Sequence, residues 1–313
     1  MQMVQIALSC RDMLTTKDWY VESFGYLPAL GEFDSETYTG PLELSALQGV
    51  PDASFRIVWL VDQQEFFQLE LFQYRSPEAR PLPADWRPCD IGYTTVGVHV
   101  EDFDAALQRL TESGSRPLTP PIGVSGARRV CVRDPDGVLV EIMEDDPRVP
   151  GSGARPRPHA PVATRMVRAS VPDLERSTAF FADALGLRPH EPTLHGPVHE
   201  RLWGLEGAKR RVQLLSAGDF WLELAEYEDP RPAPWPADYR ISDLGILNIA
   251  LGTRDKEAYA VTRDAAKSVG HLNPENDVGL ATVTYTMDDQ GFSVELMYLD
   301  ESADARAGFV PVD

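Results

Sequence analysis

The chain carries at positions 68–72 the strand-like stretch Gln68-Leu69-Glu70-Leu71-Phe72, in which one glutamate is flanked by apolar residues. Three similar stretches follow in order, and they are Leu139-Val140-Glu141-Ile142, Trp221-Leu222-Glu223-Leu224 and Ser293-Val294-Glu295-Leu296. Two stretches lie in each half, so the chain is an internal repeat. A carboxylate inside an apolar strand is costly to bury unless it is paired, hydrogen-bonded or bound to a metal. Four such carboxylates at equivalent positions predict strands that line a cavity.

The composition is typical of a globular protein, with 43% hydrophobic and 25% charged residues among 313. No apolar run approaches the roughly 18 residues of a membrane helix. The net charge of −20 repels nucleic-acid phosphates and anionic lipids, so neither is expected as a partner. The first ten residues have no basic region and no sustained apolar stretch, which favours a cytoplasmic protein. Cys10, Cys89 and Cys131 lack metal-type spacing and are expected to be reduced packing residues.

The same order of elements can be read four times along the sequence. Each unit begins with a strand, continues through a helix and closes with further strands, the last of which contains one of the four glutamates. Helices are predicted over residues 12–24, 102–113, 173–184 and 256–268. We therefore expect an α+β fold, in which four β-α-β-β-β units form two cup-like half-barrel domains. The predicted divisions are a first domain over 1–147, a proline- and glycine-rich linker over 148–161 and a second domain over 162–313.

Alternation along the opening strands indicates which face lines each cup. In the first strand Val4, Ile6 and Leu8 share one face, while Gln5 and Ala7 share the other. A strand buried on both faces in a dry core would instead be a continuous apolar run. One face is therefore expected to pack under helices, and the smaller and more polar face is expected to line a cup.

Several motifs resemble the vicinal oxygen chelate superfamily, which includes glyoxalase I, extradiol dioxygenases, methylmalonyl-CoA epimerase and the bleomycin-resistance proteins. The resemblance rests on the tandem units, on the Leu-Glu-Leu strands and on three local motifs. These are Asp173-Leu174-Glu175-Arg176-Ser177-Thr178-Ala179-Phe180-Phe181, Leu185-Gly186-Leu187, and Asp134-Pro135-Asp136-Gly137 before Glu141. It covers roughly residues 3–148 and 162–300, and it implies the fold more firmly than the reaction.

The resemblance implies that metal ligands come from the first strand and from the last-strand glutamate of a unit. The matching first-strand positions are Gln5, Thr95, Met166 and Asn248, and the last-strand positions are Glu70, Glu141, Glu223 and Glu295. None is a histidine. An iron site of two histidines and one carboxylate is therefore absent, and extradiol ring cleavage is disfavoured.

Two pairings of units remain open at the level of sequence. Pairing across the halves, as in glyoxalase I, would join Gln5, Glu70, Asn248 and Glu295, whereas pairing within the first half would join Gln5, Glu70, Thr95 and Glu141. Either oxygen-rich set suits Mg or Mn better than Zn or Fe. The remaining combination contains Met166, whose thioether is a poor ligand for a hard cation. The expectation is one divalent metal or none.

The reaction that the resemblance implies is glyoxalase-like lyase or isomerase chemistry with an enolate-type intermediate. The substrate would be a small oxygenated, partly aromatic metabolite. Glu295 or Glu70 is the expected base, with His99 as a further candidate. The alternative is a metal-free protein that binds or sequesters a small molecule, as the bleomycin-resistance members do. A monomer and a homodimer are both compatible with the sequence.

Aromatic and charged neighbours of the glutamates are the predicted substrate contacts. The predicted contacts are Phe72, Thr95, Glu141, Arg168, Trp221 and Glu223. One further hypothesis is that Arg168 forms an ion pair with Glu223, fills that cup and silences it. His195 and His199 flank Gly196-Pro197, and because proline disfavours the helix that would align them, a zinc role is not expected.

Overall fold

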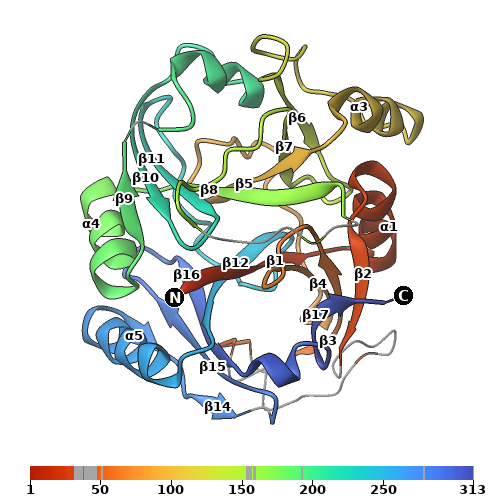
Figure 1. Cartoon of the computed structure of the whole chain (residues 1–313). Coiled ribbons are helices and arrows are strands. Elements are labelled where there is room, and N and C mark those ends of the chain that lie inside the picture. The colour runs from red at the N-terminus through yellow and green to blue at the C-terminus, as the bar shows by residue number, and fades with distance from the viewer. Residues whose placement is uncertain are drawn as a thin grey trace.

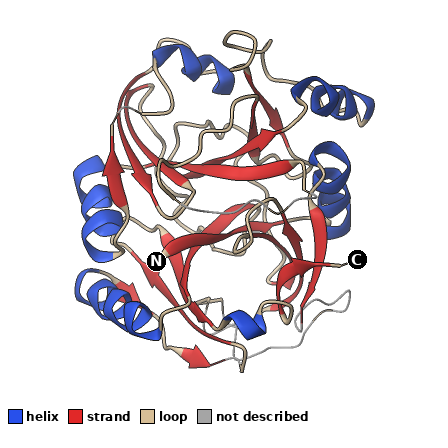
Figure 2. Ribbon diagram, in the orientation of Figure 1, coloured by secondary structure: helices blue, strands red, loops and turns tan. Residues whose placement is uncertain are grey.

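The computed structural model describes residues 1–31, 38, 48–50, 52–152, 157, 160–191, 193–277 and 279–312. Two β-sheets lie one above the other, with helices along the sides of the molecule (Figure 1, Figure 2). Each sheet combines one unit from the first half of the chain with one unit from the second half. The α+β prediction of four units that form two half-barrels is confirmed.

The first sheet unites the first and fourth units around the antiparallel pair β1–β12. Its strands follow the order β13-β15-β16-β12-β1-β4-β3-β2-β17, and β14 pairs with β15. The strands of the first unit are β1 (Gln2–Ser9), β2 (Leu27–Gly31), β3 (Ser54–Val61) and β4 (Gln68–Ser76). The others are β12 (Gly245–Thr253), β13 (His271–Leu272), β14 (Asn276–Asp277), β15 (Ala281–Met287), β16 (Ser293–Leu299) and β17 (Ala307–Pro311).

The second sheet unites the second and third units in the same way, around the antiparallel pair β5–β8. Its strand order is β6-β7-β5-β8-β11-β10-β9. The strands are β5 (Gly92–Val100), β6 (Arg129–Arg133), β7 (Leu139–Met143), β8 (Val162–Ser170), β9 (Arg188–His190), β10 (Lys209–Ser216) and β11 (Trp221–Asp229). Units therefore pair across the halves, and the alternative pairing within the first half is wrong.

In the described part of the chain, each α-helix begins after an aspartate whose side chain accepts hydrogen bonds from backbone N–H groups of the first turn. The caps are Asp12, Asp102, Asp173 and Asp255. The helices are α1 (Met13–Phe24), α3 (Phe103–Glu112), α4 (Leu174–Ala179), which continues as the π-helix η1 (Phe180–Ala184), and α5 (Lys256–Val269). Two short 3-10 helices are η2 (Pro197–Trp203) and η3 (Glu301–Ala303). Within the described ranges, no helix combines the length and apolar character needed to cross a membrane.

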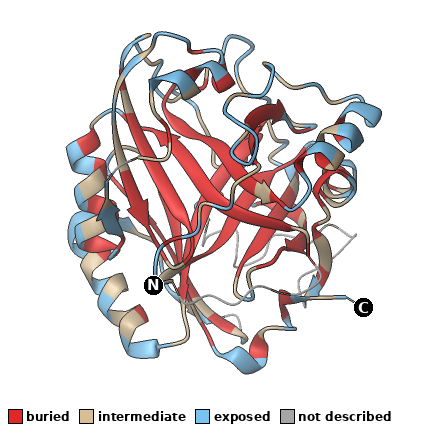
Figure 3. Cartoon of the chain, turned by 45° about the horizontal axis from the view of Figure 1, so that its top comes forward, coloured by how far each residue is buried: buried red, intermediate tan, exposed pale blue. Residues whose placement is uncertain are grey.

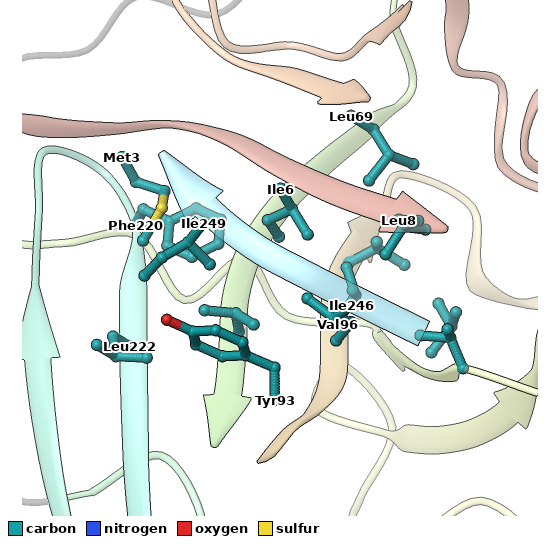
Figure 4. Close-up of a cluster of buried hydrophobic side chains, with 14 of the residues drawn as sticks. Met3, Ile6, Leu8, Leu69, Tyr93, Val96, Phe220, Leu222, Ile246 and Ile249 are labelled. Atoms are coloured by element: carbon teal, nitrogen blue, oxygen red, sulfur yellow. The ribbon is translucent and has the colours of Figure 1, made fainter. Parts of the chain in front are cut away.

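The main core fills the space between the two sheets (Figure 3). Met3, Ile6 and Leu8 of β1 lie in this core together with Val96 of β5 and Leu222 of β11 (Figure 4). Because side chains alternate along a strand, Gln5 and Ala7 lie on the opposite face of β1, inside the cup. The cysteines are free and buried, as predicted.

The C-terminal segment adds to the first sheet. Before it, Asp304 forms an ion pair with Arg254 at 2.6 Å. After it, β17 pairs with β2 and extends the first sheet by one strand. The partner strand is distant in sequence, so local patterns gave no sign of this pairing.

Candidate functional site

The first cup, formed by the first sheet, brings together three of the predicted site residues. In the strand register Ala7 lies beside Glu70 and Ala250 lies beside Glu295. Gln5 and Asn248 each lie two residues before those alanines, so they occupy equivalent positions. Gln5 Nε2 is 2.5 Å from Glu70 Oε2 and 3.5 Å from Glu295 Oε2. The result is a buried cluster of one amide and two carboxylates.

The other hydrogen-bond partners of these glutamates are neutral side chains on neighbouring strands. Trp59 Nε1 donates to Glu70 Oε1 at 3.0 Å, and Tyr285 OH donates to Glu295 Oε2 at 2.9 Å. The register explains both contacts, because Trp59 lies opposite Glu70 and Tyr285 lies opposite Glu295. No ion pair is recorded for either glutamate among the described residues. The sequence interpretation did not identify Trp59 or Tyr285.

Burial controls the protonation of this cluster. It raises the pKa of Glu70 well above its usual value, and the nearby charge of Glu295 adds to the effect. Burial also raises the pKa of Glu295 to about 7, although the Tyr285 hydroxyl opposes the rise. Near neutral pH the two carboxyl groups therefore hold a proton that Glu295 can gain or lose.

A cavity of about 90 Å³ lies against the cluster. Gln5, Glu70 and Glu295 contribute its polar surface, and the predicted contact Phe72 lies in its wall. The other aromatic walls are Phe55, Trp59, Tyr285 and Phe309. Such a mixture suits a small molecule with an apolar or aromatic part and a few oxygens.

Asn248, the fourth member of the predicted set, is buried but is not among the residues that line this cavity. Its Oδ1 atom has no hydrogen-bond partner in the described part of the chain. An unpaired buried carbonyl oxygen is uncommon, because losing water without gaining a new partner costs free energy. Asn248 therefore has a buried, unpaired oxygen on β12, the strand that pairs with β1.

The second cup, formed by the second sheet, contains Glu141 and Glu223 at the equivalent positions. His195 lies between them, with Nε2 2.9 Å from Glu141 Oε1 and Nδ1 3.0 Å from Glu223 Oε2. Arg129 contacts Glu141 at 3.1 Å, and Arg168 contacts Glu223 at 3.0 Å. The hypothesis that Arg168 pairs with Glu223 agrees with this geometry. The role of His195 was missed, since it comes from a loop without periodicity.

These cations reverse the effect of burial in the second cup. Burial by itself would lower the pKa of His195, but Glu141 and Glu223 outweigh it and raise that pKa to about 9. Burial would raise the pKa of Glu223, but His195 and Arg168 outweigh it and lower that pKa to about 2. The pKa of Glu141 is also lowered, because His195 and Arg129 outweigh burial. At neutral pH this cup holds charged, mutually paired side chains.

The remaining predicted residues also lie in the second sheet. Thr95 lies opposite Arg168, and Trp221 Nε1 donates to the carbonyl oxygen of Pro147 at 2.5 Å. His99 lies on β5, where Nδ1 is 3.3 Å from the carbonyl oxygen of Met143. His99 therefore lies in the second sheet and away from the glutamates of the first cup, and its role as a base stays a prediction.

In the usual protein metal sites, several histidine, cysteine or acidic side chains lie close together. Across the described ranges, no group of three or more histidine, cysteine, aspartate or glutamate side chains could hold a metal ion. The first cup offers two carboxylates and amide groups instead. Such a set contains only oxygen ligands, which hard cations such as Mg²⁺ prefer.

A chain of four repeated units, with two cups and paired glutamates inside each, defines a vicinal-oxygen-chelate type of protein. Two family models, both described as Glyoxalase/Bleomycin resistance protein/Dioxygenase superfamily, match residues 4–132 and 164–305. The chain belongs to this superfamily as a member with two domains in tandem.

Solved structures agree with the fold. Glyoxalase I from Zea mays is similar with a TM-score of 0.63 and 16% identity, over 98% of this chain and 96% of that chain. A protein from Bacillus subtilis subsp. subtilis str. 168, provisionally described as a dioxygenase, has a TM-score of 0.62 and 12% identity, over 100% of this chain and 91% of its own. At these identities the likeness shows the fold alone. No curated protein sequence matches the chain.

Proposed function

We propose that the first cup is the site of glyoxalase-like lyase or isomerase chemistry on a small oxygenated, partly aromatic metabolite. The observation that carries the proposal is the buried pair Glu70 and Glu295, which faces a cavity and whose hydrogen-bond partners among the described residues are neutral. Carboxyl groups with raised pKa values in a cavity favour a role in proton transfer. The charged pairs of the second cup favour a structural role there.

The residues of the first cup fit a divalent cation. Glu70 and Glu295 supply carboxylate oxygens, and Gln5 can present its amide oxygen. An all-oxygen set favours Mg or Mn over Zn or Fe. Such a cation, when bound, would polarise substrate oxygens and stabilise negative charge on them.

In this proposal Glu295 removes a proton from a carbon next to a substrate carbonyl group. A base with a pKa of about 7 is effective near neutral pH, because much of it is ionised and it still binds the proton strongly. Tyr285 holds the carboxylate in place through its hydroxyl group. Glu70, which Gln5 also contacts, can return a proton.

The test combines cation binding with proton exchange. Electron paramagnetic resonance should detect one Mn²⁺ per chain in the wild type. Proton NMR in deuterium oxide should detect exchange at the carbon next to the carbonyl group in a panel of small hydroxy- and keto-carbonyl compounds. Glu295→Gln should slow this exchange by about 100-fold or more. The exposed Glu228→Gln is the matched control, and full exchange activity in Glu295→Gln would refute the assignment.

A second candidate function is metal-free binding of a small aromatic molecule. It is favoured by the orientation of Gln5 in which Nε2 donates to Glu70, because this orientation satisfies a carboxylate without a cation. This function would give no Mn²⁺ binding and no proton exchange. It would instead give saturable quenching of Trp59 fluorescence by an aromatic ligand, and Trp59→Phe would remove that signal.

A further inference from the structure

Gln68 connects the candidate site to the C-terminal strand β17. It lies two residues before Glu70 on β4, is buried, and lines the cavity of the first cup. One end of its amide faces the main-chain carbonyl oxygens of Gly308 and Ala307, at 2.8 and 3.1 Å. The other end faces Trp59 Nε1 at 3.2 Å and the amide of Gln5 at 2.8 Å.

The surroundings of Gln68 allow only one orientation of its amide. A glutamine amide has an NH₂ end that donates and an oxygen end that accepts, and its neighbours decide which end lies where. Main-chain carbonyl oxygens only accept, so the end that faces Gly308 and Ala307 must be the NH₂ group. The opposite end is then the oxygen, and it accepts from the indole N–H of Trp59.

This orientation determines the orientation of Gln5. Because the Gln68 oxygen faces the Gln5 amide at 2.8 Å, Gln5 must present its NH₂ group to Gln68. The amide oxygen of Gln5 then occupies the position 2.5 Å from Glu70 Oε2 and 3.5 Å from Glu295 Oε2. Three oxygen acceptors at such distances need a cation or a proton between them. In the opposite orientation Gln5 would donate to Glu70, and the cluster would need no cation.

We propose that Gln68, oriented by the main-chain carbonyl groups of β17, is a positioning residue that turns the amide oxygen of Gln5 toward Glu70 and Glu295 and so gives the first cup affinity for a hard divalent cation. The inference rests on the proposed function, in which such a cation binds. It adds that the C-terminal strand, which lies beyond the residues matched by the family models, prepares the site.

Two features make this arrangement specific to the first unit. The residues two positions before the other glutamates are Leu139, Trp221 and Ser293, and none has an amide side chain. In β17, Gly308 has a φ of +76°, and a Cβ atom there would lie 2.7 Å from the Trp59 ring. Glycine therefore lets the strand approach closely enough for its carbonyl groups to reach Gln68.

The test is the affinity for Mn²⁺, measured by electron paramagnetic resonance on the full chain. Gln68→Met keeps the length of the side chain and removes both hydrogen-bonding ends. Loss of such an outer partner commonly weakens metal binding by about 10- to 100-fold, and we expect a change in that range. Ser293→Ala, at the equivalent position of the fourth unit, should bind as the wild type does.

A second variant keeps the inference testable if Gln68→Met folds poorly. Gly308→Ala leaves Gln68 intact but displaces the carbonyl groups that orient it, so it should also weaken Mn²⁺ binding by about tenfold or more. Thermal unfolding is recorded for both variants. A lower melting temperature with an unchanged dissociation constant would assign Gln68 a merely structural role and overturn the inference.

The outcomes separate this inference from the function on which it rests. Equal Mn²⁺ binding by the wild type and Gln68→Met overturns the positioning role but leaves the cation site in place. Weaker binding by Gln68→Met together with normal binding by Gly308→Ala removes the role of β17. If the wild type itself binds no Mn²⁺, the cation site fails, and the inference fails with it.

Discussion

The two cups place paired glutamates at the same positions of the same fold, yet the pKa values of the two pairs are shifted in opposite directions. In the first cup Glu70 and Glu295 contact neutral donors, and burial raises their pKa values. In the second cup Glu141 and Glu223 contact His195 and arginines, and their pKa values are lowered. All four carboxylates are buried, so the neighbours decide whether a buried carboxylate is charged.

The comparison also explains why one cup is available for a ligand and the other is not. In the second cup an imidazole ring occupies the space between the glutamates, and positive side chains already neutralise them. In the first cup the amide of Gln5 contacts both glutamates, and a cavity lies against them. A cation would compensate the charge of Glu70 and Glu295, whereas it would compete with His195 in the second cup.

The largest loss of folding stability is expected from Glu223→Gln in the second cup. The variant leaves Arg168 and His195 without their shared carboxylate, and breaking a buried ion pair costs about 3–5 kcal/mol. Urea unfolding at pH 7 measures the loss, with the exposed Glu228→Gln as control. A loss no larger than that of the control would show that the second cup does not depend on its charges.

A slightly smaller change in the free energy of unfolding is expected when the pH rises above 6.5. The pKa of His195 is raised from 6.5 to about 9, so its stabilising contribution is complete below pH 6.5 and is lost as the pH rises to 9. A shift of this size corresponds to about 3 kcal/mol of unfolding free energy. His195→Gln should be less stable at pH 6 and should lack this decline. The exposed His271→Gln should retain it, and an equal slope in His195→Gln would contradict a charged His195.

The sequence predicted most of the fold because its signal is repeated four times. Alternating strands, aspartate-capped helices and apolar segments around a glutamate are local features that survive in each unit. The same regularity placed Gln5, Glu70 and Glu295 on inward faces, where strand register brings them together. Which units pair was left open, because both pairings bury similar faces and only long-range packing distinguishes them.

The parts that sequence reasoning missed depend on contacts between distant segments. His195 reaches the second cup from the loop before η2, where no periodic pattern applies. Trp59 and Tyr285 could have been found, because they lie opposite Glu70 and Glu295 in adjacent hairpin strands. At the equivalent positions of the second cup, Cys131 lies opposite Glu141 and Leu214 lies opposite Glu223. Hydrogen-bond donors opposite the glutamates therefore distinguish the first cup already in the sequence.

Glu295→Gln should change stability in the opposite direction from Glu223→Gln. Without a cation, a folded-state pKa of about 7 means that stability is lost as the pH rises from 4.5 through 7. The amide cannot ionise, so the variant should be more stable than the wild type by about 3 kcal/mol at pH 8 and about equal to it at pH 4.5. Urea unfolding in EDTA measures this difference. Asp134 also has a pKa raised to about 7, so the difference between the two proteins is the informative quantity.

The smallest effect is expected from Tyr285→Phe, which removes the hydroxyl group that donates to Glu295 at 2.9 Å. Hydrogen bonds to charged groups contribute about 1.5 kcal/mol, so the pKa of Glu295 should rise by about one unit. Carbon-13 NMR of labelled glutamate carboxyl groups measures the shift in the absence of cations. Tyr227→Phe, which alters the second cup, is the matched control and should leave the pKa of Glu295 unchanged. If Tyr285→Phe also leaves that pKa unchanged, burial alone sets it, and the neutral donors do not distinguish the first cup from the second.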